Sequence, residues 1–113
     1  MFYKKDTSGY KELIPGVKLK TLTYGNKTLL SEFLIEQGIS LPKHHHSCEQ
    51  TGYLISGSML LTIGDETYEV TPGDSWSVPS DVVHSAAASE DSVIIEVFSP
   101  VRKEYLPENL LKE

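Results

Sequence analysis

The sequence predicts an all-β fold, either a β-sandwich or a β-barrel. Its β-prone residues gather in short runs, separated by Gly, Pro, Asn and Asp at spacings of roughly eight to twelve residues. Several runs alternate apolar and polar residues, as half-buried strands do. No helical periodicity lies between the runs, which excludes an α/β fold. We expect about eight or nine short strands.

The first half of the chain predicts two hairpins. Residues 17–24 and 28–36 are β-prone and flank a Gly-Asn turn, so we expect them to form an antiparallel pair. Residues 53–56 and 59–63 flank Gly57-Ser58, which predicts a second hairpin.

The second half continues with short strands. Residues 66–70 follow a Gly-Asp turn, which predicts a hairpin with the strand before it, and 76–78 form a short strand that Pro79 ends. Residues 83–88 come next. Residues 93–98 are the most β-prone run of the sequence and are followed by a Ser-Pro pair.

The carboxy-terminal segment allows at most a short helix. Pro107 prevents a long one, so we expect a single turn or two at residues 108–111. The length of 113 residues fits one domain, residues 1–113, around one core. Residues 1–12 are polar enough to form an arm.

Composition narrows the range of partners. No apolar run approaches the roughly 20 residues of a membrane-spanning helix, so we expect no membrane segment. The net charge of −6 has the wrong sign for contacts with nucleic acid. The one cysteine, Cys48, cannot form an internal disulfide, and no apolar leader opens the chain. We therefore expect a cytoplasmic protein.

The histidines indicate a metal site. All four lie at two places, the triplet at positions 44–46 and His84. On an extended strand His44, His46 and Gln50 project to one side, so two imidazoles and an amide oxygen converge. His84, on a separate strand, can supply a third nitrogen. Such a set fits one divalent ion, and zinc, nickel, iron, cobalt and manganese all remain open.

Each of these residues also has a plainer interpretation. The triplet could be exposed and flexible, and Gln50 could be a structural amide. Cys48 shares the side of His44 and His46, where a buried thiol is favoured over a further ligand. His45 and Glu49 would face away from the site.

The spacing of these residues resembles that of the cupin superfamily. Its first motif is matched by Gly38, His44, His46, Gln50 and Gly57, with Gln50 where the common pattern has a glutamate. The second motif is matched by residues 73, 79 and 84, with an aspartate, residue 81, where a glycine is frequent. The resemblance implies a double-stranded β-helix, the cupin jelly-roll barrel, with its metal-motif core at about 38–98. It also implies a homodimer.

The carboxy-terminal third is similar to small pectin-degradation cupins of the KdgF type. The similarity lies in residues 96–106, Glu-Val-Phe-Ser-Pro-Val-Arg-Lys-Glu-Tyr-Leu. That family linearises 4,5-unsaturated monouronates from pectin or alginate into open-chain keto acids. Its active residues are an acid, a phenylalanine and an arginine, which correspond to Glu96, Phe98 and Arg102. The acid here is a glutamate where the family has an aspartate. The resemblance implies a carboxylate-bearing sugar as the small-molecule substrate.

The residues themselves leave alternatives open. Arg102, the one arginine of the chain, suits a substrate carboxylate but could be a surface cation. Glu96 shares the side of Phe98 and is catalytic, paired or ligated if that side is the interior, but solvated if it is not. Trp76, Tyr53 and Phe98 are expected to line the barrel. Two other functions remain open, a metal-dependent dioxygenase and a non-catalytic module that binds a small ligand.

Overall fold

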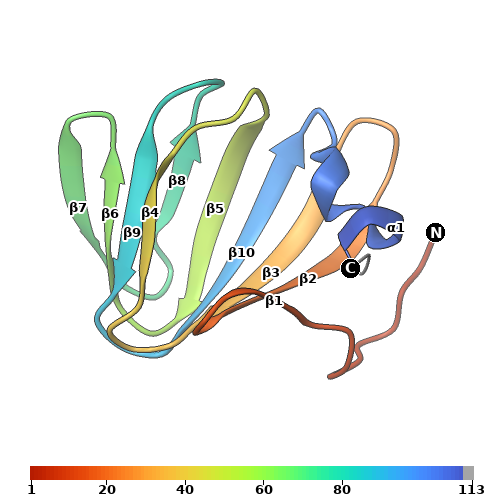
Figure 1. Ribbon diagram of the computed structural model, residues 1–113, viewed down its shortest axis with the longest axis horizontal. Coiled ribbons are helices and arrows are strands. Elements are labelled where there is room, and N and C mark those ends of the chain that lie inside the picture. The colour runs from red at the N-terminus through yellow and green to blue at the C-terminus, as the bar shows by residue number, and fades with distance from the viewer. Residues whose placement is uncertain (111–113) are drawn as a thin grey trace.

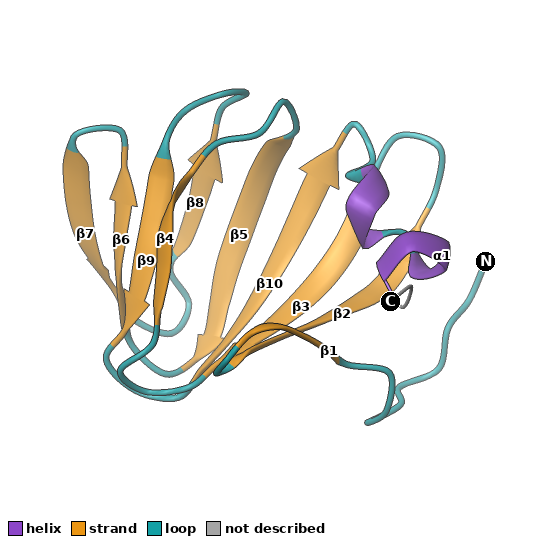
Figure 2. Ribbon diagram, viewed as in Figure 1, coloured by secondary structure: helices purple, strands orange, loops and turns teal. Residues whose placement is uncertain are grey.

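The computed structural model describes residues 1–110 and places ten strands in two antiparallel sheets that face each other (Figure 1, Figure 2). One sheet has six strands in the order β1-β2-β3-β10-β5-β8, and the other has four in the order β4-β9-β6-β7. Two packed sheets of this kind form a jelly roll, which confirms the predicted all-β class. The strands are β1 (Lys11–Ile14), β2 (Val17–Tyr24), β3 (Leu29–Ile35), β4 (Ser40–His44), β5 (Glu49–Ser56), β6 (Met59–Ile63), β7 (Glu66–Val70), β8 (Ser75–Val78), β9 (His84–Ala88) and β10 (Ser92–Ser99).

Alternation along the central strands separates an inner face from an outer one. On β10 every second residue is buried, beginning with Ser92 and including Ile94, Glu96 and Phe98. On β3, which pairs with β10, Leu29 and Phe33 are buried in the same rhythm. Because successive side chains of a strand point to opposite faces, each sheet contributes one apolar face to the core between the sheets.

Two of the three predicted hairpins are present. β2 pairs with β3 and β6 pairs with β7, as the turn residues indicate. The prediction of a hairpin from residues 53–56 and 59–63 is wrong. These residues belong to β5 and β6, and β5 pairs with β10 and β8, whereas β6 pairs with β7 and β9 in the other sheet.

Gly57 explains this crossing between sheets. Its φ is +97°, and a Cβ at this position would lie 2.3 Å from Ser92 Oγ and 2.4 Å from the carbonyl oxygen of Asp91. Only glycine fits such a close approach in this backbone conformation. The glycine therefore packs the chain against the start of β10 and directs it to the opposite sheet.

Both ends of the described chain pack beside the six-stranded sheet. A 3₁₀ helix, η1 (Lys103–Tyr105), is followed by α1 (Pro107–Leu110), and both lie near β2, β3 and β10 (Figure 1). This agrees with the short helix expected at residues 108–111, although residue 111 lies outside the described residues. Within residues 1–110, no helix is long and apolar enough to cross a membrane.

The amino-terminal segment is held against the outside of the same sheet. The Lys20 ammonium donates to the carbonyl oxygen of Asp6 at 2.6 Å, and the Tyr10 hydroxyl donates to the carboxylate of Glu32. β1 begins at Lys11, so the last two residues of the stretch that was expected to be an arm already belong to a strand.

Candidate metal centre and adjoining cavity

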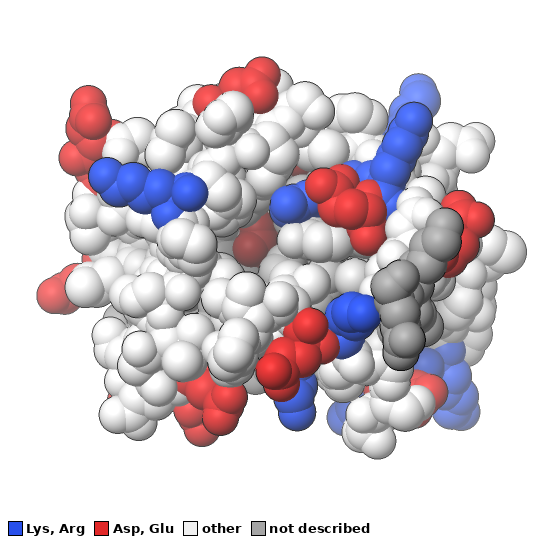
Figure 3. Space-filling view, viewed as in Figure 1, with Lys and Arg blue, Asp and Glu red and all other residues white. Residues whose placement is uncertain are grey.

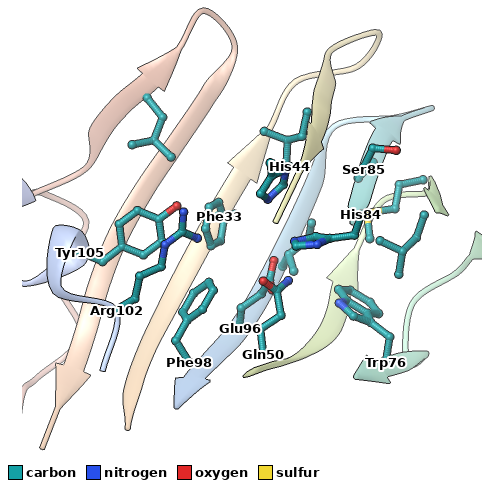
Figure 4. A pocket seen from close by; sticks show the side chains of 16 residues that line it. Phe33, His44, Gln50, Trp76, His84, Ser85, Glu96, Phe98, Arg102 and Tyr105 are labelled. Carbon is teal, nitrogen blue, oxygen red and sulfur yellow. The ribbon is translucent and has the colours of Figure 1, made fainter. Parts of the chain in front are cut away.

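A cavity between the two sheets collects the polar residues that the sequence singles out. Side chains from both sheets and from the segment after β10 line it (Figure 4). In the space-filling view this face of the molecule is hollowed near its centre, and acidic side-chain atoms lie at the bottom of the hollow (Figure 3). The polar lining residues include His44, Gln50, His84, Glu96 and Arg102.

Three imidazoles meet at one side of this cavity. His44, His46 and His84 each present a ring nitrogen, and these nitrogens all lie within 4.8 Å of one another. The Nδ1 atoms of the three rings lie 2.8, 2.9 and 2.9 Å from backbone carbonyl oxygens, each belonging to a residue two positions away. Because a carbonyl only accepts, Nδ1 carries the proton and Nε2 keeps its lone pair.

These lone pairs have a geometry that suits a metal ion. The Nε2 atoms of His46 and His84 are buried, and among the described residues neither has a hydrogen-bond partner. A buried polar atom without a partner is costly in a folded protein. Ligation of an ion would satisfy both atoms, and a carbonyl on Nδ1 is the usual second contact of a metal-binding histidine.

Burial keeps the rings of His46 and His84 neutral. Desolvation lowers the pKa of His84 to about 4, and the positive charges of the other two histidines and of Arg102 act in the same direction. Desolvation also lowers the pKa of His46, and the charge of Arg102 adds to the effect. These two rings are therefore unprotonated at neutral pH, as ligands must be.

The backbone that positions the histidines differs from the expected continuous strand. His44 ends β4 opposite His84, the first residue of β9, but residues 45–48 leave the strand before β5 begins. Burial nevertheless keeps the expected alternation, with His45 and Glu49 exposed. The prediction of which side chains share a face is correct, although a loop carries His46.

Asp81 anchors this loop. Its backbone N–H donates to the carbonyl oxygen of His46 at 2.8 Å, and its own φ is +63°. A positive φ is the conformation that glycine adopts most easily and that aspartate tolerates better than most residues. The aspartate therefore occupies a position with the backbone demand of a glycine.

Gln50 and Glu96 form a buried polar pair beside the histidines. The Gln50 amide nitrogen donates to a carboxyl oxygen of Glu96, and both side chains are buried between the sheets (Figure 4). Since the amide nitrogen is used in this bond, the amide oxygen of Gln50 remains available as a further ligand.

Glu96 is an acid in an apolar interior. Its side chain is 8% exposed, and burial raises its pKa to about 8, although Arg102 and the Gln50 hydrogen bond oppose the rise. The interior alternative for Glu96 is therefore the observed one. At neutral pH this carboxyl group holds a proton that it can donate.

Arg102 lies at the other side of the cavity. Its side chain is 15% exposed, and its guanidinium carbon is 4.2 Å from the ring centroid of Tyr105 and 5.2 Å from that of Phe98. A carboxylate oxygen of Glu104 lies 3.6 Å from its Nε. Sequence analysis missed Tyr105. The signal for it was its spacing of three residues from Arg102, one turn of a 3₁₀ helix.

The aromatic lining is partly as expected. Phe98 is buried, with its ring centroid 5.7 Å from that of His46. Trp76 lines the cavity and covers Gly52, where an added Cβ would lie 2.3 Å from the indole. Tyr53 was expected in the lining but is 48% exposed, because β5 buries Gly52 and Leu54 on its inner face and turns Tyr53 outward.

Cys48 fits its expected place as a buried thiol. Its side chain is buried, and this burial raises its pKa, so the group stays a neutral thiol at neutral pH.

Comparison with known proteins identifies similar chains. Residues 31–99 match the family model described as "Cupin domain". The chain is 27% identical to the pectin degradation protein KdgF of Dickeya dadantii, over 93% of this chain and 97% of that protein. The solved structure of KdgF from Halomonas sp. superposes with a TM-score of 0.88 at 27% identity, covering 94% of this chain and all of that one. An RmlC-like cupin from Shewanella frigidimarina has the same TM-score at 23% identity over 93% and 95% of the two chains, and supports the fold alone.

Proposed function

Because this chain belongs to the cupin domain family, we propose that it is a metal-dependent enzyme of uronate catabolism. Its substrate in this proposal is a 4,5-unsaturated monouronate, and its product is the linear keto acid. Similarity to two KdgF proteins over nearly the whole length of the chain supports this reaction class. The substrate is small and carboxylate-bearing, which agrees with a cavity inside a single barrel.

One observation carries the proposal. A single cavity is lined by histidines, by a buried carboxyl group with a raised pKa, and by the one arginine of the chain. These groups are what the conversion needs: a site that polarises oxygen, a proton donor and a partner for a carboxylate.

In the proposal, His44, His46 and His84 hold one divalent ion through Nε2, and Gln50 contributes its amide oxygen. When bound, the ion supplies Lewis acidity toward the oxygen atoms of the substrate. All four donors are neutral, so they leave the double charge of the ion uncompensated, which favours an anionic substrate. The donor set does not choose among zinc, nickel, iron, cobalt and manganese.

The reaction is an isomerisation. The hydroxyl group at C1 loses its proton, and the bond from C1 to the ring oxygen breaks, which leaves an aldehyde at C1 and an enolate whose oxygen is bonded to C5. The enolate becomes a ketone at C5 when C4 gains a proton. In the proposal Glu96 donates the proton that C4 gains, and the proton lost at C1 restores the acid.

Arg102 and Phe98 position the substrate. A guanidinium pairs with a carboxylate through two parallel hydrogen bonds, so Arg102 is assigned to the uronate carboxylate. Phe98 is fully buried between His46 and Arg102, and its ring keeps water away from this part of the cavity.

The test measures loss of the enol-ether absorbance of unsaturated galacturonate, with proton NMR to identify the open-chain product. The expected result is conversion above the spontaneous rate by metal-loaded protein, with Glu96→Gln retaining the metal but losing turnover. Glu49→Gln removes an exposed acid from the neighbouring strand and serves as the matched control.

The same preparation tests the dioxygenase alternative, which rests on three histidines because this donor set also suits iron. If the unsaturated uronate decays only at its spontaneous rate, while a phenolic or diketone substrate consumes oxygen, the uronate function is wrong.

A further inference from the structure

The environment of Arg102 differs from that of an ordinary surface arginine. Its Nε atom is buried and, among residues 1–110, has no hydrogen-bond partner. Glu104 lies 3.6 Å from that nitrogen, but the Glu104 side chain is 65% exposed, so water screens this pair strongly. The guanidinium of Arg102 is therefore largely buried, and no buried carboxylate of the described residues neutralises its charge.

Two aromatic rings hold the guanidinium instead. The rings of Phe98 and Tyr105 are 5.4 Å apart and nearly perpendicular, at 76°, and the guanidinium carbon lies against both. The contact with Tyr105, at 4.2 Å, is the closer one. A cation over an aromatic face is attracted by the ring. The Tyr105 hydroxyl also lies beside the guanidinium (Figure 4), and burial raises the pKa of this hydroxyl to about 12, although a hydrogen bond with Arg102 opposes the rise.

The position of Tyr105 is fixed from three directions. Its backbone N–H donates to the carbonyl oxygen of Arg102 at 3.0 Å, closing the 3₁₀ turn that brings residues i and i+3 to the same side. The Thr21 hydroxyl on β2 donates to the Tyr105 carbonyl oxygen, and Phe33 on β3 packs edge-on against the ring at 6.1 Å. These contacts thus fix the place at which the ring meets the arginine side chain.

We propose that Tyr105 is a positioning residue that holds the guanidinium of Arg102 toward the cavity while leaving most of its N–H donors, Nε–H among them, free for a substrate carboxylate. This inference rests on the proposed function. A carboxylate in place of Tyr105 would fix the arginine equally well, but it would occupy the same donors that the substrate needs. Tyrosine orders the cation mainly through its ring and takes at most one of these donors, so Tyr105 contributes to substrate affinity and not to proton transfer.

The test compares variants that keep or remove the ring at position 105. Tyr105→Phe keeps it and is expected to bind and turn over substrate within about threefold of wild type. Tyr105→Met removes it but fills a similar space, and we expect KM for unsaturated galacturonate to rise about five- to thirty-fold with kcat nearly unchanged. Tyr24→Met removes a partly buried tyrosine of β2 that packs against the same core, and serves as the control for general loss of packing.

Binding of saturated D-galacturonate to the metal-loaded protein, measured by titration calorimetry, gives a readout without turnover. Its Kd should rise with Tyr105→Met by the same factor as KM. In an Arg102→Lys background the effect should disappear, because an ammonium does not stack on the ring as a guanidinium does. A purely structural role of Tyr105 would survive in that background and would lower kcat as well.

A ring-fluorinated phenylalanine at position 105 covers the case in which Tyr105→Met does not fold. Fluorine removes electron density from the ring face but keeps its shape, so the Kd for galacturonate should rise relative to Tyr105→Phe. Equal Kd values for the two rings would overturn the proposal. If the wild-type protein binds galacturonate but does not convert the unsaturated sugar, the proposed function fails. The positioning role of Tyr105 is then judged on the binding data alone. If the wild-type protein does not bind it, both fail.

Discussion

Replacing Glu96 by glutamine is expected to stabilise the metal-free protein, increasingly so as the pH rises. Burial raises the pKa of this carboxyl group from 4.5 to about 8. The folded protein therefore binds a proton that the unfolded chain releases above pH 4.5. Stability from this group is fully present below pH 4.5 and is lost as the pH rises toward 8. Glutamine keeps the shape of the side chain and cannot ionise, so the variant does not suffer this loss.

The magnitude follows from the two pKa values. Between pH 5 and pH 7.5, the free energy of unfolding of wild type should fall relative to Glu96→Gln by about 3 kcal/mol. For a domain of this length, such a difference corresponds to a relative change in Tm on the order of 10 to 20 °C. The histidines are common to both proteins, so their titration largely cancels from the comparison.

The measurement is urea unfolding of chelator-treated protein at several pH values between 5 and 7.5. Glu49→Gln, which removes an exposed carboxylate from β5, should show a difference from wild type that hardly depends on pH. A Glu96→Gln difference that stays constant across this range would refute the reasoning. Glu96 would then be ionised in the folded protein at both ends of the range, held by the charge of Arg102.

Three other expectations concern the metal centre and the substrate. By elemental analysis, His84→Ala should lose most of the bound metal, whereas His45→Ala, which changes an exposed histidine, should keep it. Full occupancy in His84→Ala would remove His84 from the ligand set. Arg102→Ala should weaken substrate binding by about ten- to a hundred-fold, mainly in KM, because a guanidinium-carboxylate contact contributes about 1.5 to 3 kcal/mol; Lys103→Ala is the control, and an equal effect on both would indicate general electrostatics. Asp81→Gly should leave thermal stability unchanged or slightly higher, because φ is +63° at this position and glycine adopts that conformation easily. Asp81→Val should lower the free energy of unfolding by about 1 to 2 kcal/mol. Equal melting temperatures for the two variants would show that the backbone carries no strain at this position.

Strand alternation explains why the side chains of the candidate site could be predicted. Gln50 and Glu96 lie on strands that are paired over many residues, so a period of two decides which face each one occupies. His44 ends the short strand β4, where its pairing with His84 fixes its position. The burial of the histidine segment also alternates as this rule predicts, although His46 lies in a loop, and the backbone N–H of Asp81 ties that loop down at the carbonyl oxygen of His46.

The errors arose where distant residues decide the local structure. A Gly-Ser pair looks like a hairpin turn, and only the contact of Gly57 with Ser92 shows that the chain changes sheet there. β4 was missed because Pro42 and Lys43 interrupt its apolar pattern, and pairing with β9 overrides that weak propensity. Tyr105 was missed because Thr21, 84 residues away, fixes the turn that carries it.

The pairing of Gly52 with Trp76 separates the size of the cavity from its chemistry. The indole occupies the space that a side chain at position 52 would fill, yet neither residue supplies a proton, a proposed ligand or a charge. Any larger residue at position 52 would displace the indole, and a smaller residue at position 76 would widen the cavity. The size of the ligand that the barrel admits can therefore change through this one contact, while the histidines, the acid and the arginine stay as they are.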